Sequence, residues 1–293
     1  MKKLFAGLVI CLLMLSAVAC SSTSSGSGSE GDMSTLEKAK EEGKIVVGFS
    51  GEVPYAYEDE NGNLTGQSVE VARAVFKELG IEEMEGKLTK FGSLIPGLQS
   101  GTFDVITAGM YITPERCEQV DFGEPEYSIG EALAVQKGNP LNLHSYEDIV
   151  NNPDVKVSIM NGAIEIDYLK AVGIDENQFE IVQDIPSNIT ALESGRVDAI
   201  TMTGPTLESA LATANAQNIE RVEDFVQPTI DGESIRGYGA AAFKKEDDDL
   251  RTAYNEALQK LKDSGELLEI ISDFGFTEAD LPGDMTTEQL CQR

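Results

Sequence analysis

Two patterns of apolar positions alternate along the chain, and together they predict a parallel sheet with covering helices. Near-continuous apolar runs at 44–49 and 103–108 predict strands that are buried on both faces. Between these runs, one set of apolar residues has the spacing of a helix face: Val69, Ala72, Val75, Phe76 and Leu79. A strand at 87–91 and a helix at 93–99 are expected next, so strand–helix–strand units repeat, which is typical of an α/β fold.

A similar stretch occurs twice, which predicts two lobes of related structure. Residues 98–106 and 192–200 lie 192 − 98 = 94 positions apart and share a leucine, a Ser-Gly pair, an aspartate and an isoleucine in one register. Any helix-to-strand junction looks similar, but the common register favours two lobes. The extended segments 131–136 and 237–243 are expected to connect these lobes, and an amphipathic helix at 250–261 is expected to pack back on the first.

The N-terminus has the pattern of an export signal. Lys2 and Lys3 precede an apolar run at 4–18 that is short for a membrane span. Small residues then lead to Cys20, and 21–29 contain only Ser, Gly and Thr, the composition of a flexible coil. We expect a lipid on Cys20 and a membrane-tethered protein; an ordinary signal peptide with free secretion is the alternative.

These features suggest a division of the chain and a sorting of its cysteines. The expected parts are a signal peptide (1–19), the lipidated cysteine with its linker (20–33), the first part of lobe 1 (34–135), lobe 2 (136–237), and the return of lobe 1 with a C-terminal tail (238–293). Cys11 would leave with the signal peptide, so Cys117 and Cys291 remain for the folded part. Outside the cytoplasm two such cysteines tend to pair, so we favour a bridge over two free thiols.

Charge and residue types exclude several functions. The formal net charge of −29 argues against nucleic acid or another anionic polymer as a partner. The acidity fits either a solubilising surface or a saline habitat in which salt screens the repulsion. His144 is the single histidine, no His/Cys spacing suggests zinc, and no phosphate-binding loop occurs. We therefore expect no enzyme, no cofactor and no metal site.

The segment 109–116, Gly-Met-Tyr-Ile-Thr-Pro-Glu-Arg, directly follows a predicted buried strand. In open α/β sheets, ligands bind in the crevice at the carboxyl ends of the strands. Arg116 offers a planar, permanently charged group that matches a carboxylate. The alternative is an exposed arginine at a helix start, because Thr113 and Pro114 are typical of an N-cap and a first helical residue.

Four longer runs, at 91–98, 111–117, 138–148 and 274–278, carry a resemblance to a known family. With the order of the expected elements, they resemble the amino-acid-type (family 3) solute-binding proteins of ABC importers, and within them the ectoine- and hydroxyectoine-binding lipoproteins. The resemblance implies a two-lobed periplasmic-binding-protein fold (type II), with mostly parallel sheets flanked by helices and joined by two crossover strands. It also implies a monomeric extracytoplasmic receptor that delivers its ligand to the transmembrane subunits of a permease.

The resemblance assigns roles to individual residues. Arg116 matches the residue that holds a ligand carboxylate, and Glu52 matches an acidic group that faces the ligand's positive charge. An aromatic cage and backbone groups of both lobes complete the expected site: Tyr55, Phe91, Tyr111, Gly109, Met110, Gly162, Ala163 and Ile164. At Thr203, amino-acid binders of this family commonly have an aspartate for the ligand's ammonium. A hydroxyl cannot neutralise an ammonium, which favours a dispersed cation such as the amidinium of ectoine over a standard amino acid.

Other interpretations stay open at this point. The aromatic residues Tyr55, Phe91 and Tyr111 could be ordinary core side chains. A polar amino acid could be the ligand in place of ectoine. A prephenate-type dehydratase on the same fold, with Glu52 as its acid, is the enzyme alternative. A sensor that signals to a separate membrane receptor is a third class.

Overall fold

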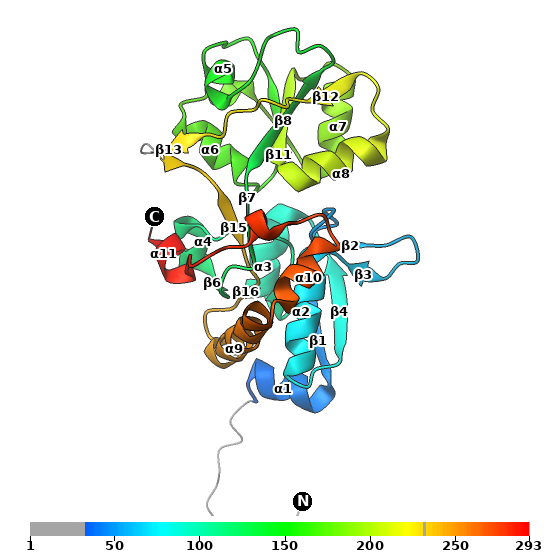
Figure 1. Cartoon of the computed structure of the whole chain (residues 1–293), viewed down its shortest axis with the longest axis vertical. Helices are drawn as coiled ribbons and strands as arrows, with labels where there is room; N and C mark the ends of the chain where they lie inside the picture. Colours follow the sequence, from blue (N-terminus) through cyan, green and yellow to red (C-terminus); the bar gives the residue numbers. More distant parts are fainter. Residues whose placement is uncertain (1–32, 231–232, 293) are drawn as a thin grey trace, which may run out of the picture. The chain divides into compact units, whose positions relative to one another are not determined.

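Two five-stranded sheets form the frame of the protein (Figure 1). The computed structural model of the chain describes residues 33–230 and 233–292. The expected signal peptide, Cys20 and the linker up to residue 32 lie outside the described residues. None of the helices in the described part of the chain is long and apolar enough to cross a membrane.

The first sheet is mixed, with the strand order β4-β1-β5-β16-β6. Its strands are β1 (Lys44–Phe49), β4 (Glu83–Leu88), β5 (Val105–Ile106), β6 (Asp121–Phe122) and β16 (Ala242–Phe243). β1 runs parallel to β4 and β5, whereas β16 runs antiparallel to β5 and β6. With β16 the chain therefore returns to the first sheet after the second.

The second sheet has the order β10-β9-β11-β8-β12 and lies between the two halves of the first sheet in sequence. Its strands are β8 (Glu131–Gln136), β9 (Val157–Met160), β10 (Phe179–Val182), β11 (Ala199–Thr203) and β12 (Ile219–Arg221). β9 is parallel to β10 and β11, and β8 is antiparallel to β11 and β12. Both sheets therefore contain a parallel core with antiparallel strands beside it.

The connection between the sheets differs from the prediction at one boundary. Residues 131–136, expected as a crossover, form β8 inside the second sheet, because their backbone pairs with β11 and β12. The preceding strand β7 (Tyr127–Ile129) pairs instead with β15 (Gly237–Gly239). Two crossing segments therefore lie side by side, and lobe 2 begins nearer residue 130 than 136. Two more short pairs occur, β2 (Tyr57–Glu58) with β3 (Leu64–Thr65) and β13 (Thr229–Ile230) with β14 (Glu233–Ser234).

The strand predicted at 87–91 was also misplaced. The structure has β4 at Glu83–Leu88, followed by a 3₁₀ turn, η1 (Phe91–Ser93). β4 is an edge strand whose residues are mostly half-buried or exposed. Its sequence, Glu-Met-Glu-Gly-Lys-Leu, therefore lacks the apolar run that identifies a covered strand.

Helices flank both sheets (Figure 1). With the first sheet are α1 (Thr35–Glu42), α2 (Gln67–Glu78), α3 (Leu94–Gln99), α4 (Pro114–Gln119), α9 (Asp248–Ser264), α10 (Glu266–Ser272), α11 (Thr287–Cys291) and the 3₁₀ turn η3 (Glu278–Asp280). With the second are α5 (Tyr146–Val150), α6 (Glu165–Ala171), α7 (Ile185–Glu193), α8 (Gly204–Ala214) and the 3₁₀ turn η2 (Glu176–Gln178). The predicted amphipathic helix is α9. Its buried Tyr254 packs edge-on against Phe76 of α2 at 5.5 Å between ring centroids, so α9 does pack on the first lobe.

Candidate functional site

A small cavity of about 30 Å³ lies among the carboxyl ends of strands from both sheets. β1 and β5 of the first sheet lead into one side of it, and β9 and β11 of the second sheet lead into the other. The lining residues are Glu52, Tyr55, Phe91, Gly109, Tyr111, Arg116, Met160, Ala163, Ile164, Glu165, Ile185, Thr201, Met202 and Thr203. Residues predicted from distant parts of the sequence therefore meet at one cavity.

Arg116 is buried in the wall of this cavity rather than exposed at a helix start. Thr113 does cap α4, since its hydroxyl accepts a hydrogen bond from the Arg116 N–H at 3.2 Å. The guanidinium donates from Nη1 to the Tyr111 carbonyl at 2.8 Å and from Nη2 to the Gly162 carbonyl at 2.9 Å. It also lies 5.7 Å from the centre of the Phe91 ring. Burial lowers the Arg116 pKa from its ordinary value, but guanidinium stays charged in proteins. Arg116 has further N–H donors that can serve a ligand carboxylate.

The three predicted aromatic residues are buried and line the cavity, so they belong to the core and to the candidate site at once. Tyr55 stacks on Tyr127, with ring centroids 5.2 Å apart and planes 29° apart. Tyr111 lies 6.3 Å from the same Tyr127 ring. Rings packed on one side by the core and open to a cavity on the other form a rigid apolar wall.

A chain of hydroxyl contacts joins the two sides of the cavity. The Tyr55 hydroxyl donates to Thr203 Oγ1 at 3.0 Å, and Thr203 Oγ1 donates to Thr206 Oγ1 at 2.9 Å. Thr206 Oγ1 then donates to Glu52 Oε1 at 2.7 Å. Tyr55 and Glu52 follow β1 in the first sheet, whereas Thr203 ends β11 and Thr206 belongs to α8. Thr206 was not predicted from the sequence.

Glu52 is a carboxyl group with little access to solvent. Only 7% of the residue is exposed, and burial raises its pKa to about 7, against the opposing effect of the Thr206 hydrogen bond. A positive group beside Glu52 would favour its ionised form. This is the behaviour expected of a residue that faces the cationic part of a ligand.

Two further carboxyl groups at this site were missed in the sequence. Glu165 lines the cavity, and Glu131 lies next to it; both residues are 3% exposed. Burial raises the pKa of each, and that of Glu131 is raised further by the charge of Glu165. Glu165 begins α6, where an acidic residue ordinarily serves only the helix terminus. Glu131 begins the apolar strand β8 and gave no signal of its own.

The backbone groups predicted for the site divide between the cavity and its surroundings. Gly109, Ala163 and Ile164 line it, while Met110 and Gly162 line a neighbouring hollow that also contains Arg116. The backbone group that Gly162 contributes is its carbonyl, which accepts a hydrogen bond from Arg116. The Ala163 N–H is already bonded to the Met160 carbonyl at 3.1 Å. The turn at Gly162 and Ala163 therefore positions Arg116 through a carbonyl group, and its Ala163 amide is not free for a ligand.

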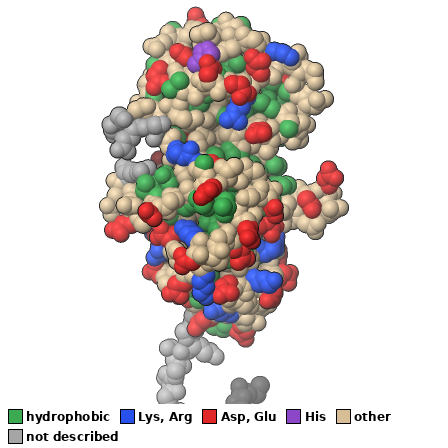
Figure 2. All heavy atoms as spheres, viewed as in Figure 1, with side chains coloured by type: hydrophobic (Ala, Val, Ile, Leu, Met, Phe, Trp, Pro, Cys, Tyr) green, Lys and Arg blue, Asp and Glu red, His purple; other side chains and the backbone are tan. Residues whose placement is uncertain are grey.

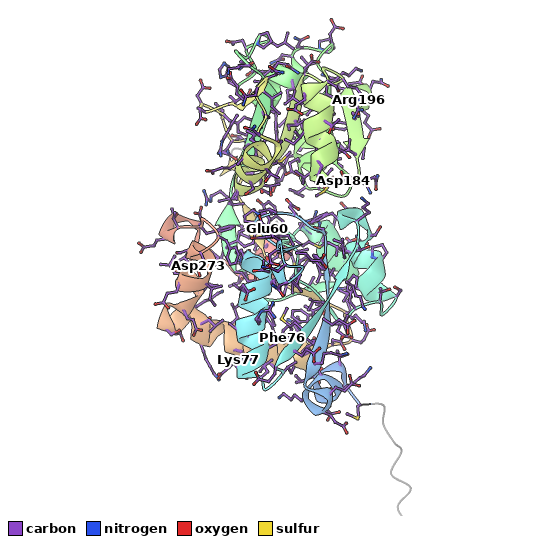
Figure 3. The ribbon with its side chains drawn as sticks, turned by 90° about the vertical axis from the view of Figure 1, so that its right-hand side faces the viewer. Glu60, Phe76, Lys77, Asp184, Arg196 and Asp273 are labelled. Atoms are coloured by element: carbon purple, nitrogen blue, oxygen red, sulfur yellow. A yellow bond between two sulfur atoms is a disulfide. The ribbon has the colours of Figure 1, made fainter. Side chains whose placement is uncertain are left out.

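Contacts outside the cavity also connect the two sheets. Lys90 Nζ and Asp184 Oδ2 form an exposed ion pair at 2.9 Å, and Asp184 is the N-cap of α7. Figure 3 shows Asp184 on the side of the second sheet that faces the first. With the hydroxyl chain and Arg116, this ion pair holds the cleft closed. Exposed ion pairs of this kind contribute little stability by themselves.

A disulfide joins Cys117 and Cys291, with their Cα atoms 5.8 Å apart. It connects the terminal helix α11 to α4, the helix that carries Arg116. His144 lies away from the cavity and forms a contact of 2.7 Å with Asp224. The described part of the chain contains no cluster of three or more side chains that could hold a metal ion. Acidic and basic side chains are interspersed over the face shown in Figure 2.

Comparison with known proteins identifies the family to which the chain belongs. Residues 45–277 match the family described as bacterial extracellular solute-binding proteins, family 3. A probable amino-acid ABC transporter periplasmic-binding protein, y4tE, from Sinorhizobium fredii (strain NBRC 101917 / NGR234) is 38% identical over 261 residues, covering 88% of this chain and 86% of the relative. The arginine-binding extracellular protein ArtP of Bacillus subtilis (strain 168) is 29% identical over 91% of this chain and 95% of its own length.

Solved structures agree with this match. The crystal structure of EhuB in complex with hydroxyectoine has a TM-score of 0.79 and 35% identity, covering 87% of this chain and 97% of EhuB. An ancestral arginine-binding protein bound to arginine has a TM-score of 0.68 and 31% identity, covering 79% and 98%. The fold is the type II periplasmic-binding fold, and the chain belongs to the family 3 extracellular solute-binding proteins, which bind amino-acid-like ligands for ABC importers.

Proposed function

We propose that this chain is the extracytoplasmic receptor of an ABC importer, and that it binds ectoine or hydroxyectoine in the cavity beside Arg116 and delivers it to the permease. Family membership supports the receptor role, since the matched relatives are transport binding proteins. The structural neighbour solved with hydroxyectoine supports the choice of ligand.

The observation that carries this proposal is a buried cation and a buried carboxyl group on one aromatic-lined cavity. Ectoine is a cyclic zwitterion with a carboxylate and an amidinium. Its carboxylate would form a charge-assisted pair with Arg116. Its amidinium is a broad, weakly hydrated cation that suits the faces of Tyr55, Phe91 and Tyr111, at about 0.5–2 kcal/mol for each ring. Glu52 would neutralise the amidinium.

A basic amino acid is the second candidate, and one observation favours it. Glu165 gives the cavity a second carboxyl group in addition to Glu52. An amino acid such as arginine has one carboxylate and two cationic groups, so it could use Arg116 and both acids. The lack of an acid at Thr203 therefore does not exclude an ordinary ammonium, because the second lobe supplies the Glu165 carboxyl group instead.

A thermal-shift panel with the purified protein separates these candidates. The ligands are ectoine, hydroxyectoine, glycine betaine, proline and the standard amino acids. A ligand at one hundred times its Kd stabilises the protein by about 2.7 kcal/mol, which is readily measured. A shift with the ectoines alone supports the proposal. A shift with arginine or lysine and none with the ectoines replaces the ligand but keeps the receptor role.

We also infer a lipid anchor on Cys20 and a monomeric state. The apolar run before Cys20 and the Ser/Gly stretch after it support a tethered domain. Replacing Cys20 with serine should release the protein from the membrane fraction into the medium, while light scattering should give the mass of one chain. Membrane association of the C20S variant would contradict the anchor.

A further inference from the structure

The carboxyl groups of Glu131 and Glu165 form a buried acid pair behind the candidate ligand cavity. Glu131 is the first residue of β8 and lies opposite Thr203 of β11 in the antiparallel register. Gln227 fixes its backbone from both sides, because Oε1 accepts the Glu131 N–H at 2.8 Å and Nε2 donates to the Glu131 carbonyl at 2.7 Å. Glu165 follows the turn after β9 and lines the cavity itself. The Glu131 side chain therefore projects from a fixed backbone.

Neither carboxyl oxygen of Glu131 has a hydrogen-bond partner within the described residues. The Tyr111 hydroxyl also has no hydrogen-bond partner within the described residues. It lies near Glu131 and lowers the pKa of Glu131 slightly. A buried carboxylate without donors is unfavourable. A protonated carboxyl group is itself a donor, and the Glu165 carboxylate beside it is an acceptor.

Among the described residues, the charged groups that act most strongly on Glu131 are acids rather than bases. Glu165 and Glu52 act on Glu131, and both raise its pKa. Burial raises the pKa of Glu165, and the adjacent Glu131 side chain and, more weakly, the charge of Arg116 oppose that rise. Other groups that sense the pair are Tyr55, Tyr111, Tyr146, Tyr168 and Asp167. Two adjacent buried carboxyl groups do not both ionise without a cation, so the pair keeps one proton.

We propose that Glu131 is a positioning residue that keeps a proton and donates a hydrogen bond to Glu165. Glu165 then faces the cavity as a carboxylate, which the second lobe offers to a cationic N–H group of the ligand. The inference rests on the proposed function in one respect, that the cavity takes a zwitterion. Burial and the two neighbouring acids hold the pKa of Glu131 well above its usual range, whereas Glu165 is the member of the pair close to Arg116. The proton therefore resides on Glu131, away from the ligand.

Three variants test the assignment through binding. E131Q keeps the shape and an N–H donor but cannot ionise, so its Kd for ectoine or for L-arginine should stay within about threefold of wild type. E131A removes the donor and should weaken binding by at least about tenfold, the loss of one hydrogen bond to a charged group. E165Q removes the acceptor charge and should weaken it at least as much. Equal losses in E131Q and E131A would overturn the proposal, as would unchanged affinity in all three variants.

A second measurement needs no ligand and so separates this inference from the proposed function. In the folded wild-type protein, Glu131 keeps its proton to a higher pH than it does in the unfolded chain, because its pKa is raised by burial and by neighbouring acids. The free energy of unfolding of the wild type should therefore fall relative to that of E131Q as the pH rises from about 4.5. Parallel pH profiles of the two proteins would overturn the proposal even if ectoine binds. A growing difference would uphold the proton on Glu131 even if the panel finds another ligand.

Discussion

Arg116 and Gly162 are joined by a hydrogen bond of 2.9 Å that connects helix α4 to the turn after β9 of the second sheet. The same guanidinium is bonded to the Tyr111 carbonyl at 2.8 Å, next to the first sheet. Two carbonyl groups therefore align the arginine before any ligand carboxylate reaches it. The residue that is proposed to bind the ligand is also one of the contacts that close the cleft.

Replacing Arg116 with alanine should reduce ligand affinity by about thirtyfold or more, because truncating one partner of a buried charge pair costs about 2–5 kcal/mol or more. The matched control is R196A. Arg196 is half-exposed, contacts Glu180 and does not line the cavity (Figure 3). Isothermal titration calorimetry measures the affinity, and circular dichroism checks the fold. An R116A variant with the affinity of R196A would contradict the assignment of the carboxylate site.

Ligand affinity should depend on the ionisation of Glu52. Burial raises the pKa of Glu52 to about 7, and a ligand cation would favour its carboxylate, so binding below that pH must release a proton. The Kd should rise as the pH falls from 7 toward 5, by up to about tenfold for each pH unit. E52Q should bind more weakly at pH 8 and lose this part of the pH dependence. The exposed Glu60 serves as the control through E60Q (Figure 3). Identical pH profiles for E52Q and wild type would remove Glu52 from the site.

The stability of the ligand-free protein should fall as the pH rises through the titration of Glu126. This residue is 1% exposed, and its Oε1 accepts a hydrogen bond from the Tyr254 hydroxyl at 2.8 Å. Burial raises its pKa from 4.5 to about 7. Between these values the folded protein binds more protons than the unfolded chain, so the free energy of unfolding decreases by about 3 kcal/mol from pH 4.5 to 7.

Urea unfolding of wild type and E126Q across this range measures the effect. E126Q should show a flatter profile, because its amide does not titrate, whereas the exposed E118Q should follow wild type. A profile of E126Q as steep as that of wild type would mean that folding does not raise the pKa of Glu126.

The hydroxyl of Tyr55 should contribute to closure of the cleft. It donates to Thr203 Oγ1 at 3.0 Å across the two sides of the cavity. Tyr146 offers a matched control, since its hydroxyl contacts Thr201 at 2.6 Å within the second lobe. Y55F should lower ligand affinity by about threefold to tenfold, the value of one hydrogen bond of about 0.5–1.5 kcal/mol. Y146F should lower the melting temperature with little change in affinity. Equal effects of the two variants on affinity would show that the Tyr55 contact has no special part in closure.

The sequence could predict those parts of the fold that are covered on both faces. β1 and β5 stand out as apolar runs because helices or neighbouring strands cover them, and α9 stands out by its helix-spaced buried face. β4 could not be located because an edge strand with exposed side chains has no such run. The crossover was misplaced by a few residues, since β8 has the same apolar pattern in the second sheet that a crossing segment would have.

The same contrast holds within the candidate site. Arg116 was found through the predicted strand before it and the family resemblance of the run that contains it, both of which can be read from a short stretch of sequence. Glu131 and Glu165 are 165 − 131 = 34 residues apart, and only folding of lobe 2 brings their carboxyl groups together. A single acidic residue at the start of an apolar strand gives no signal that it will be buried beside another. Contacts of this kind depend on register, which residue types alone do not give.

The disulfide between Cys117 and Cys291 should stabilise the fold without setting ligand affinity. It closes 291 − 117 = 174 sequence intervals, and loops of this length correspond to at most about 5 kcal/mol of stabilisation by chain entropy. The tail is also held by other contacts, because Leu290 is buried and the Thr287 N–H is bonded to Glu124 Oε2 at 3.1 Å.

The C117S/C291S variant should therefore lose several kcal/mol of unfolding free energy. Its Kd at a temperature where it remains folded should stay within about threefold, since α4 keeps its cap and Arg116 keeps both carbonyl partners. Reduction of the wild-type protein should give the same two results, which excludes an effect of the serines themselves. A large loss of affinity in both experiments would show instead that the bridge holds Arg116 in place.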